Sequence, residues 1–195
     1  MIILFDTNCN IKKKVIEKWL KKNDINDDVT FINSKVNDTL IPIQPINSGC
    51  RLTCNDKISS IKNNLNEICD YIVLIDENLE IYSDKIVFYY YISILNMNTD
   101  DKVEKKSEVI EIRYDILDKF PFFLDVLNYL EEIYIESKNN YIYDGCSVTF
   151  SNIISKVNSK LTQDNWTEEV FRKPKNELIS NLLNSLNLEN LNLVS

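Results

Sequence analysis

The sequence predicts an α/β protein with a central mixed sheet and flanking helices, in a single domain over residues 1–195. Two observations predict this class. Segments with the apolar and β-branched composition of strands alternate with segments whose apolar residues recur at helical spacing. No internal repeat and no linker-like stretch divides the chain, whose length suits one domain with a sizeable core.

The predicted elements share these two kinds of pattern and follow in this order: strand 2–5, helix from residue 11, strand 29–36, loop 37–49, helix 51–68, strand 71–75, strand 85–95, strand 109–112, helix 122–135, strand and turn 141–150, extended hairpin or flap 151–164, and helix 175–188.

The first strand is a short apolar run that ends in Asp6-Thr7-Asn8, three residues of types that cap helices. From Ile11 the apolar residues recur at helical spacing, with lysines on the other face. The loop at 37–49 carries Pro42, Pro45 and a glycine, which are turn and loop formers.

Later in the chain, the apolar run 71–75 is followed by Asp76-Glu77-Asn78, which predicts a buried strand ending in a polar turn. Residues 85–95 are β-branched and aromatic, as in a strand. Pro121 suits the first turn of the helix at 122–135. Leu178, Ile179, Leu182 and Leu183 give the last helix its apolar face.

Composition and charge exclude several functions. The net charge of −8 argues against a nucleic acid polymer or a membrane surface as partner, because both are polyanions that need a basic face. The absence of histidine excludes Ser-His-Asp, Cys-His and histidine–metal chemistry. No signal peptide and no membrane span are visible, and the five scattered cysteines are expected to be reduced thiols. A cytoplasmic location is therefore expected.

A phosphate site is one interpretation of the first helix. Free N–H groups at a helix N-terminus attract phosphate oxygens, and Thr7, Asn8 and Lys12 lie at this start. The alternative is an ordinary capped helix with a solvated lysine face. Asp76 follows a predicted strand, where it could hold a divalent metal or orient a water. The alternative there is a polar turn with solvent-exposed acids.

Taken together, three segments of the chain resemble motifs of the inosine/xanthosine triphosphatase family, which hydrolyses non-canonical purine nucleoside triphosphates. They are Asp6-Thr7-Asn8-Cys9-Asn10-Ile11-Lys12, Ile41-Pro42-Ile43-Gln44-Pro45 and Asp70-Tyr71-Ile72-Val73-Leu74-Ile75-Asp76. Gly145 and Arg172 are similar to a later glycine and arginine of the family. The match follows the family's order over residues 1 to about 95 and is looser beyond.

The resemblance implies a cleft between two lobes, a homodimer and a metal-dependent nucleoside-triphosphatase. It implies Asp76 as the catalytic residue and ligand of Mg²⁺ or Mn²⁺, with Thr7, Asn8, Lys12 and Arg172 binding the purine nucleoside triphosphate. The A/T-biased composition fits a viral or parasite genome, and hence a location inside an infected host cell.

The chain also departs from the family's pattern. Cys9 stands at the loop proline, Lys12 is one residue late, and the stretch 48–57 that follows Gln44-Pro45 holds no glutamate. Missing glutamates remove metal ligands or a water-activating base. Two alternatives therefore stay open: a catalytically inactive descendant that binds a nucleotide or a partner or serves as a structural subunit, and an unrelated α/β interaction protein.

Overall fold

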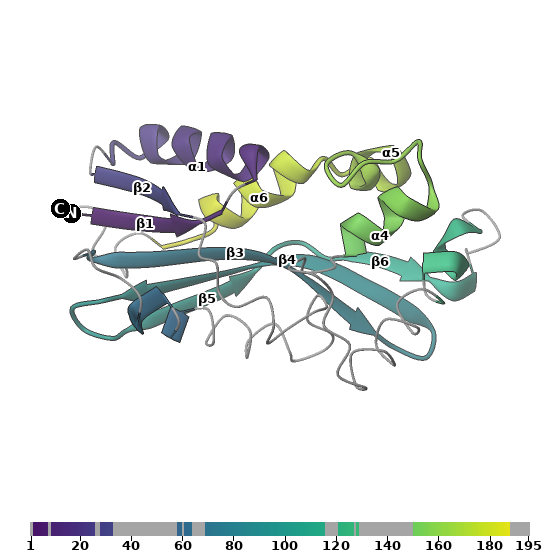
Figure 1. Ribbon diagram of the computed structural model, residues 1–195, viewed down its shortest axis with the longest axis horizontal. Helices are drawn as coiled ribbons and strands as arrows, with labels where there is room; N and C mark the ends of the chain where they lie inside the picture. The colour runs from purple at the N-terminus through teal and green to yellow at the C-terminus, as the bar shows by residue number, and fades with distance from the viewer. Residues whose placement is uncertain are drawn as a thin grey trace.

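The structure, a computed structural model, describes residues 2–7, 9–25, 28–32, 58–59, 61–63, 69–115, 121–126, 128 and 150–187. Within these residues a six-stranded mixed sheet is combined with helices, so the predicted α/β class with a central mixed sheet is confirmed (Figure 1). No helix in this part of the chain is long and apolar enough to cross a membrane.

The strands of the sheet are β1 (Ile2–Asp6), β2 (Asp28–Ile32), β3 (Tyr71–Ile81), β4 (Lys85–Asn96), β5 (Lys102–Lys106) and β6 (Ile110–Arg113). Their order across the sheet is β2-β1-β3-β4-β5, and β6 pairs with a different stretch of β4 from β5. β1 runs parallel to β2 and β3, whereas β4 runs antiparallel to its three neighbours. The sheet is therefore parallel among β2, β1 and β3, and antiparallel from β3 through β4 to β5 and β6.

β3 and β4 pair along their whole length, from Tyr71 opposite Asn96 to Ile81 opposite Ile86. β1 pairs only with the first part of β3 and ends at Asp6, beside Leu74. Beyond this point β3 continues next to β4 alone. The end of β1 therefore meets the middle of β3, and this junction positions the candidate site.

The polar residues Asp76, Glu77 and Asn78 lie inside β3, so the prediction of a strand that ends at residue 75 in a polar turn was wrong. Their partners on β4 are, in order, Tyr91, Tyr90 and Tyr89. The long antiparallel partner supplies backbone hydrogen bonds and large aromatic neighbours, which keep these polar residues in the strand.

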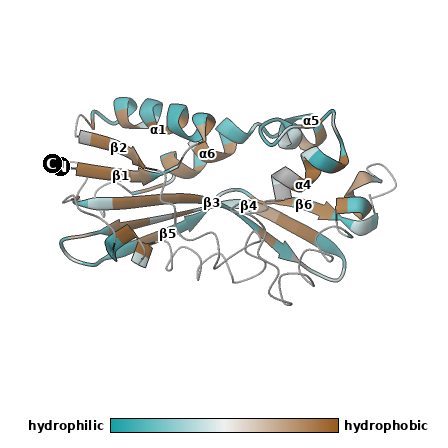
Figure 2. Cartoon of the chain, in the orientation of Figure 1, coloured by the Kyte–Doolittle hydropathy of each residue, from teal (hydrophilic) through white to brown (hydrophobic). Residues whose placement is uncertain are grey.

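The fully bounded helices are α1 (Asn10–Lys22), α4 (Phe150–Val157), α5 (Trp166–Phe171) and α6 (Lys175–Asn184). All four lie on the same side of the sheet in Figure 1. Their apolar residues bury the main core, which includes Phe88 and Trp166 with ring centroids 4.9 Å apart. The strands are largely hydrophobic and the outer face of α1 is hydrophilic (Figure 2), as the sequence pattern of α1 predicted.

A second, smaller core lies on the other face of the sheet. Ile58 and Ile61, from a short helical stretch, pack there with Leu4, Ile72 and Leu74. The sheet is therefore covered on both faces at its β1 end, as its parallel strands require.

Two local predictions were wrong. α1 has Cys9 at its N-cap with no side-chain hydrogen bond, so Asp6 and Thr7 do not cap it. Residues 151–164 do not form an extended hairpin, because α4 occupies Phe150–Val157. The segment is polar in sequence, but Ile153 and Ile154 are fully buried on its apolar face, which favours a helix.

The other predicted elements are confirmed where they are described. They are the strands at 2–5, 29–32, 85–95 and 110–112, and the helices from residue 11, at 122–126 and at 175–184. The loop at 37–49, with its Pro-x-Gln-Pro segment, the strand and turn at 141–149 and most of the helix at 51–68 lie outside the described residues.

Candidate functional site

The turn from β1 to α1 lies at the point where the pairing between β1 and β3 ends and β3 continues beside β4 alone. Thr7 follows β1, is buried, and donates its backbone N–H to the carbonyl of Ile32 at 2.8 Å. Its Oγ1 accepts the backbone N–H of Cys9 at 3.1 Å. Thr7 thus shapes the turn that leads into α1. Asn8, the other residue predicted here, lies outside the described residues.

Lys12 reaches from the first turn of α1 to β3, where its Nζ donates a hydrogen bond to the carbonyl oxygen of Ile75. Ile75 directly precedes Asp76 in the strand. The first turn of α1 holds no acidic residue, so no acidic side chain there offsets the positive end of the helix dipole. The structure thus brings Lys12 and the start of α1 to the backbone of β3 directly before Asp76 in the sequence.

Asp76 and Glu77 lie on opposite faces of the sheet, because side chains alternate along a strand. Ile75 and Leu79 face the main core under the helices, and Glu77 shares their side of β3. Leu74 faces the second core, and Asp76 shares that other side. The two acids that sequence reasoning placed in one turn therefore lie in different environments.

Asp6 shares the face of Asp76, because Leu4, two residues earlier in β1, belongs to the second core. Since Asp6 lies beside Leu74 in the register, its Cα is roughly 8 Å from that of Asp76 by strand spacing. Carboxylate oxygens are ligands that divalent cations prefer. Among the described residues, however, no group of three Asp, Glu, Cys or His side chains is placed to hold a metal ion.

On the helix face, Glu77 belongs to a buried polar cluster. Its Oε1 lies 3.2 Å from Lys175 Nζ, and its Oε2 accepts the Ser151 hydroxyl at 2.8 Å. Trp166 Nε1 donates to Ser151 Oγ at 2.9 Å. Lys175 also pairs with Asp164 at 3.3 Å. We call these five residues the Glu77–Lys175 cluster; it joins β3 to α4, α5 and α6.

The neighbouring acids of this cluster stabilise the charged form of Lys175. Burial is the largest single influence on the Lys175 pKa and acts to lower it, but Glu77, Cys9 and Asp164 together outweigh burial, so that the pKa is raised. Lys175 is therefore a protonated cation at neutral pH although only 6% of its side chain is exposed. The pairing holds a fixed positive charge close to Glu77.

Tyr90 of β4 lies directly opposite Glu77 in the antiparallel register and is fully buried. Its hydroxyl lies close enough to Glu77 for a hydrogen bond to that carboxylate to favour the protonated form. Burial, and next the Glu77 carboxylate, raise the pKa of Tyr90 well above its usual value. Lys175 Nζ stands 6.0 Å from the centre of the Tyr90 ring. Tyr90 is thus a neutral, buried donor next to the cluster.

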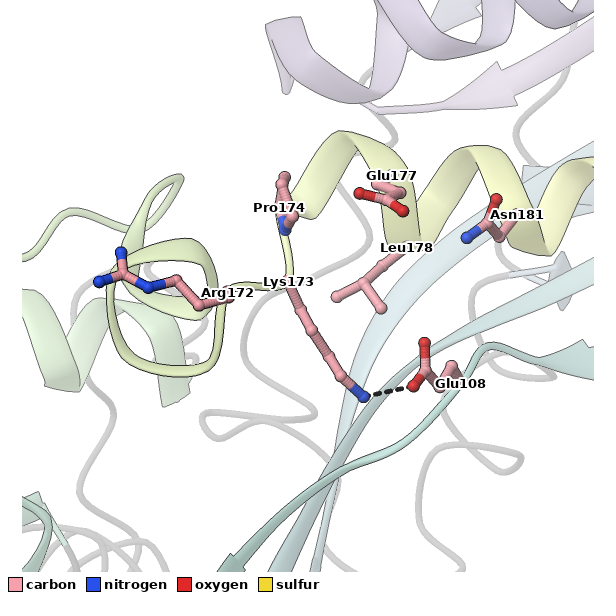
Figure 3. Close-up of a pocket in the computed structure, with 7 residues that line it drawn as sticks. All are labelled: Glu108, Arg172, Lys173, Pro174, Glu177, Leu178 and Asn181. Carbon is pink, nitrogen blue, oxygen red and sulfur yellow. Dashed lines mark hydrogen bonds and ion pairs between the residues drawn. The ribbon is translucent and has the colours of Figure 1, made fainter.

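Arg172, the predicted substrate-binding arginine, lies between α5 and α6 and is exposed. It lines a surface pocket of about 40 Å³ with Glu108, Lys173 and residues of α6, and its side chain points away from the Lys173–Glu108 ion pair (Figure 3). A nucleotide needs a cleft of roughly 300 Å³ or more. Thr7, Lys12 and Asp76 do not line this pocket, so the structure does not bring Arg172 together with them.

Thr7, Lys12 and Asp76 were selected from the sequence. Lys175, Ser151 and Tyr90 were not, and neither was the position of Asp6 on the same face of the sheet as Asp76. In the sequence, Lys175 is only a lysine in the first turn of an amphipathic helix. A lysine in that position is usually exposed to solvent, so the pattern did not indicate a buried ion pair. Its partner Glu77 lies 98 residues away in the chain, and Ser151 lies 74 residues from Glu77. Such pairs are visible only once the fold is known.

Fold and site define a mixed α/β protein in which a helix start and a lysine reach the backbone of β3 where its pairing with β1 ends, with the Asp76 carboxylate on the opposite face of the sheet. No family model and no curated protein matches the chain. The chain is similar in structure to protein VC0702 from Vibrio cholerae, with a TM-score of 0.61 at 9% sequence identity. The match covers 93% of this chain and 90% of the other. It supports the fold alone.

Proposed function

We propose that this protein hydrolyses non-canonical purine nucleoside triphosphates, those of inosine and xanthosine, as a divergent member of the inosine/xanthosine triphosphatase family. One observation carries the proposal: Lys12 Nζ binds the carbonyl of Ile75, directly before Asp76. A cation and a helix N-terminus therefore lie at the junction of β1 and β3, where the motif resemblance expects triphosphate, and the Asp76 side chain lies on the opposite face of the sheet. A cation and a helix N-terminus are groups that stabilise phosphoryl oxygens.

In this proposal the Lys12 ammonium and the backbone N–H groups at the start of α1 bind phosphate oxygens and offset the charge that develops on them. Asp76, with Asp6 on the same face, fits a divalent cation, because both offer carboxylate oxygens. Mg²⁺ or Mn²⁺ bound there would supply Lewis-acid polarisation of the phosphoryl group. Thr7 keeps the turn in the shape that presents these groups.

The proposed substrate cleft lies between two lobes. The length of β3 supports this arrangement, because the strand extends through two different parts of the sheet. One half of the sheet is formed by β2, β1 and the first part of β3, and the other half by the continuation of β3 with β4 and β6. Asp76 lies between these halves. An intracellular location and a homodimer belong to the same proposal.

A second candidate function is nucleotide binding without hydrolysis. The Glu77–Lys175 cluster favours it, because the carboxylate adjacent to Asp76 in sequence is already neutralised by a lysine and bound by Ser151. A carboxylate held in this way is a poor general base. In this candidate Lys12 and α1 still bind the phosphates.

The test measures release of phosphate and pyrophosphate from inosine, xanthosine, adenosine and guanosine triphosphates, with Mg²⁺ or Mn²⁺ and with a chelator. Turnover of the inosine and xanthosine forms is expected, with kcat/KM at least ~100-fold lower in Asp76→Asn. Asp84→Asn, an exposed acid before β4, serves as the control and should keep wild-type turnover. Absence of turnover in folded wild-type protein would refute hydrolysis, and nucleotide binding would then support the second candidate.

A further inference from the structure

Helix α1 concentrates positive charge on an acidic chain. It holds six lysines and one acid, Glu17, and therefore carries a net charge of +5, whereas the whole chain carries −8. By difference, the residues outside α1 together carry −13. The charge of α1 is thus opposite in sign to that of the rest of the protein, and its surface attracts anionic groups that the rest of the surface repels.

Three exposed lysines of α1 have no partner within the described part of the chain. Lys14, Lys18 and Lys21 form no hydrogen bond and no ion pair there, whereas Lys22 donates to Asn184 Oδ1 at 3.1 Å. The three recur at intervals of four and three residues, so they project from one side of the helix. This side is the hydrophilic outer face of α1 in Figure 2. We call Lys14, Lys18 and Lys21 the α1 lysine face.

The α1 lysine face costs the helix stability in the isolated chain. Like charges three or four residues apart on a helix repel each other. Glu17, the one acid of α1, lies among these lysines but forms no ion pair with a described residue, so it does not bind any of the ammonium groups directly. A partner that brings carboxylates to this face would remove the repulsion, which gives the arrangement an electrostatic reason to bind an anion.

The composition of the face favours an acidic protein segment over other polyanions. The exposed residues of α1 are asparagine, lysine and glutamate alone. They include no arginine, which binds phosphates in bidentate geometry, and no aromatic ring on which a nucleic acid base could stack. They include no apolar side chain that would insert into a membrane. A short acidic segment also contacts the face without crossing the negative surface around it.

We propose that the α1 lysine face docks an acidic segment of a partner protein, whose aspartates or glutamates pair with Lys14, Lys18 and Lys21. Four helical residues span roughly 6 Å, so carboxylates four apart on a helical partner match the Lys14–Lys18 interval. A symmetric contact between two copies through α1 would set lysine against lysine, so the partner is not a second α1. The proposal is independent of nucleotide hydrolysis, because Lys12 is bound to Ile75 and lies outside the face.

Fluorescence anisotropy with a short fluorescein-labelled polyglutamate peptide tests the proposal. Lys14→Glu with Lys18→Glu should weaken binding of the peptide at least about fivefold, because two attractions become repulsions. Lys156→Glu with Lys160→Glu is the matched control, since it changes net charge equally at two exposed lysines outside α1. The control should bind within about twofold of wild type, because salt screens distant charges.

Equal losses in the two double variants would overturn the proposal, because they would reflect net charge alone. Absence of peptide binding to wild type at low salt would overturn it too. Tighter binding of a single-stranded oligothymidylate of the same charge would assign the face to nucleic acid instead. Lys14→Gln with Lys18→Gln keeps polar side chains that suit a helix and should give a smaller loss in the same direction, so the test holds even where the double glutamate variant fails to fold.

Discussion

Replacing Lys175 with methionine is expected to lower the free energy of unfolding by about 3–5 kcal/mol. The change leaves the buried Glu77 carboxylate without its cation, and methionine fills a similar volume, so the effect reports the lost charge. Burial makes an unpaired carboxylate costly, since water cannot solvate it. Chemical denaturation monitored by tryptophan fluorescence measures the loss, because Trp166 lies in the same cluster.

Lys173→Met provides the matched control for this prediction. Lys173 also pairs with a glutamate, Glu108, but this glutamate is exposed at the surface. An exposed pair contributes about 0–1 kcal/mol, so the control should lose little stability. Combining Lys175→Met with Glu77→Gln should restore most of the loss. Equal small losses from Lys175→Met and Lys173→Met would show that the Glu77–Lys175 pair does not stabilise the fold.

The pH dependence of the same comparison has a defined sign. The folded-state pKa of Lys175 is raised, so its contribution to stability is fully present below the pKa of an unfolded lysine, about 10.4. It is lost as pH rises through the higher folded-state value. The stability difference between wild type and Lys175→Met should therefore stay constant from pH 7 to 9 and shrink above about pH 10.5.

Replacing Lys12 with methionine is expected to lower the affinity for a nucleoside triphosphate at least about tenfold, because the variant loses the cation that meets the phosphates. The methionine keeps most of the apolar stem of the side chain, so the fold should persist. Binding of inosine triphosphate, measured by calorimetry in the presence of a divalent metal, gives the result.

Lys14→Met is the matched control, since Lys14 lies on the same helix but is exposed. It should bind as wild type does. A Lys12→Met protein with unchanged affinity would place the phosphates elsewhere and would leave the contact between Lys12 and Ile75 with a structural role only.

Local pattern was sufficient for the elements in which one strong periodicity dominates. β4 is apolar and aromatic over nearly its whole length, and α6 carries four apolar residues at helical spacing. Both were predicted from the sequence because most residues of their buried faces are apolar. β5 and α5, which are short, were not among the predicted elements.

The errors occurred where polar side chains are buried by partners distant in sequence. β3 was expected to end at Ile75 because Asp76 and Glu77 interrupt the apolar run, yet pairing with β4 carries the strand on to Ile81. Glu77 is tolerated inside because Lys175 and Ser151 neutralise and bind it. A single-sequence pattern holds no information on such long-range compensation.

The candidate site was predicted in part for the same reason. Lys12 follows from local sequence, because it lies in the first turn of a helix whose start was visible. That Asp76 and Glu77 lie on opposite faces follows only from the extended length of β3. The second acid on the Asp76 face, Asp6, depends on the register between β1 and β3.

We propose that the junction of β1, α1 and β3 binds the phosphates of a purine nucleoside triphosphate. The most direct measurement is calorimetric titration of a non-hydrolysable inosine triphosphate analogue, with Mg²⁺, into wild-type protein and Lys12→Met. We expect saturable binding at one site per chain, weakened at least about tenfold in the variant. Absence of binding at millimolar analogue in folded wild-type protein, or equal binding by both proteins, would contradict it.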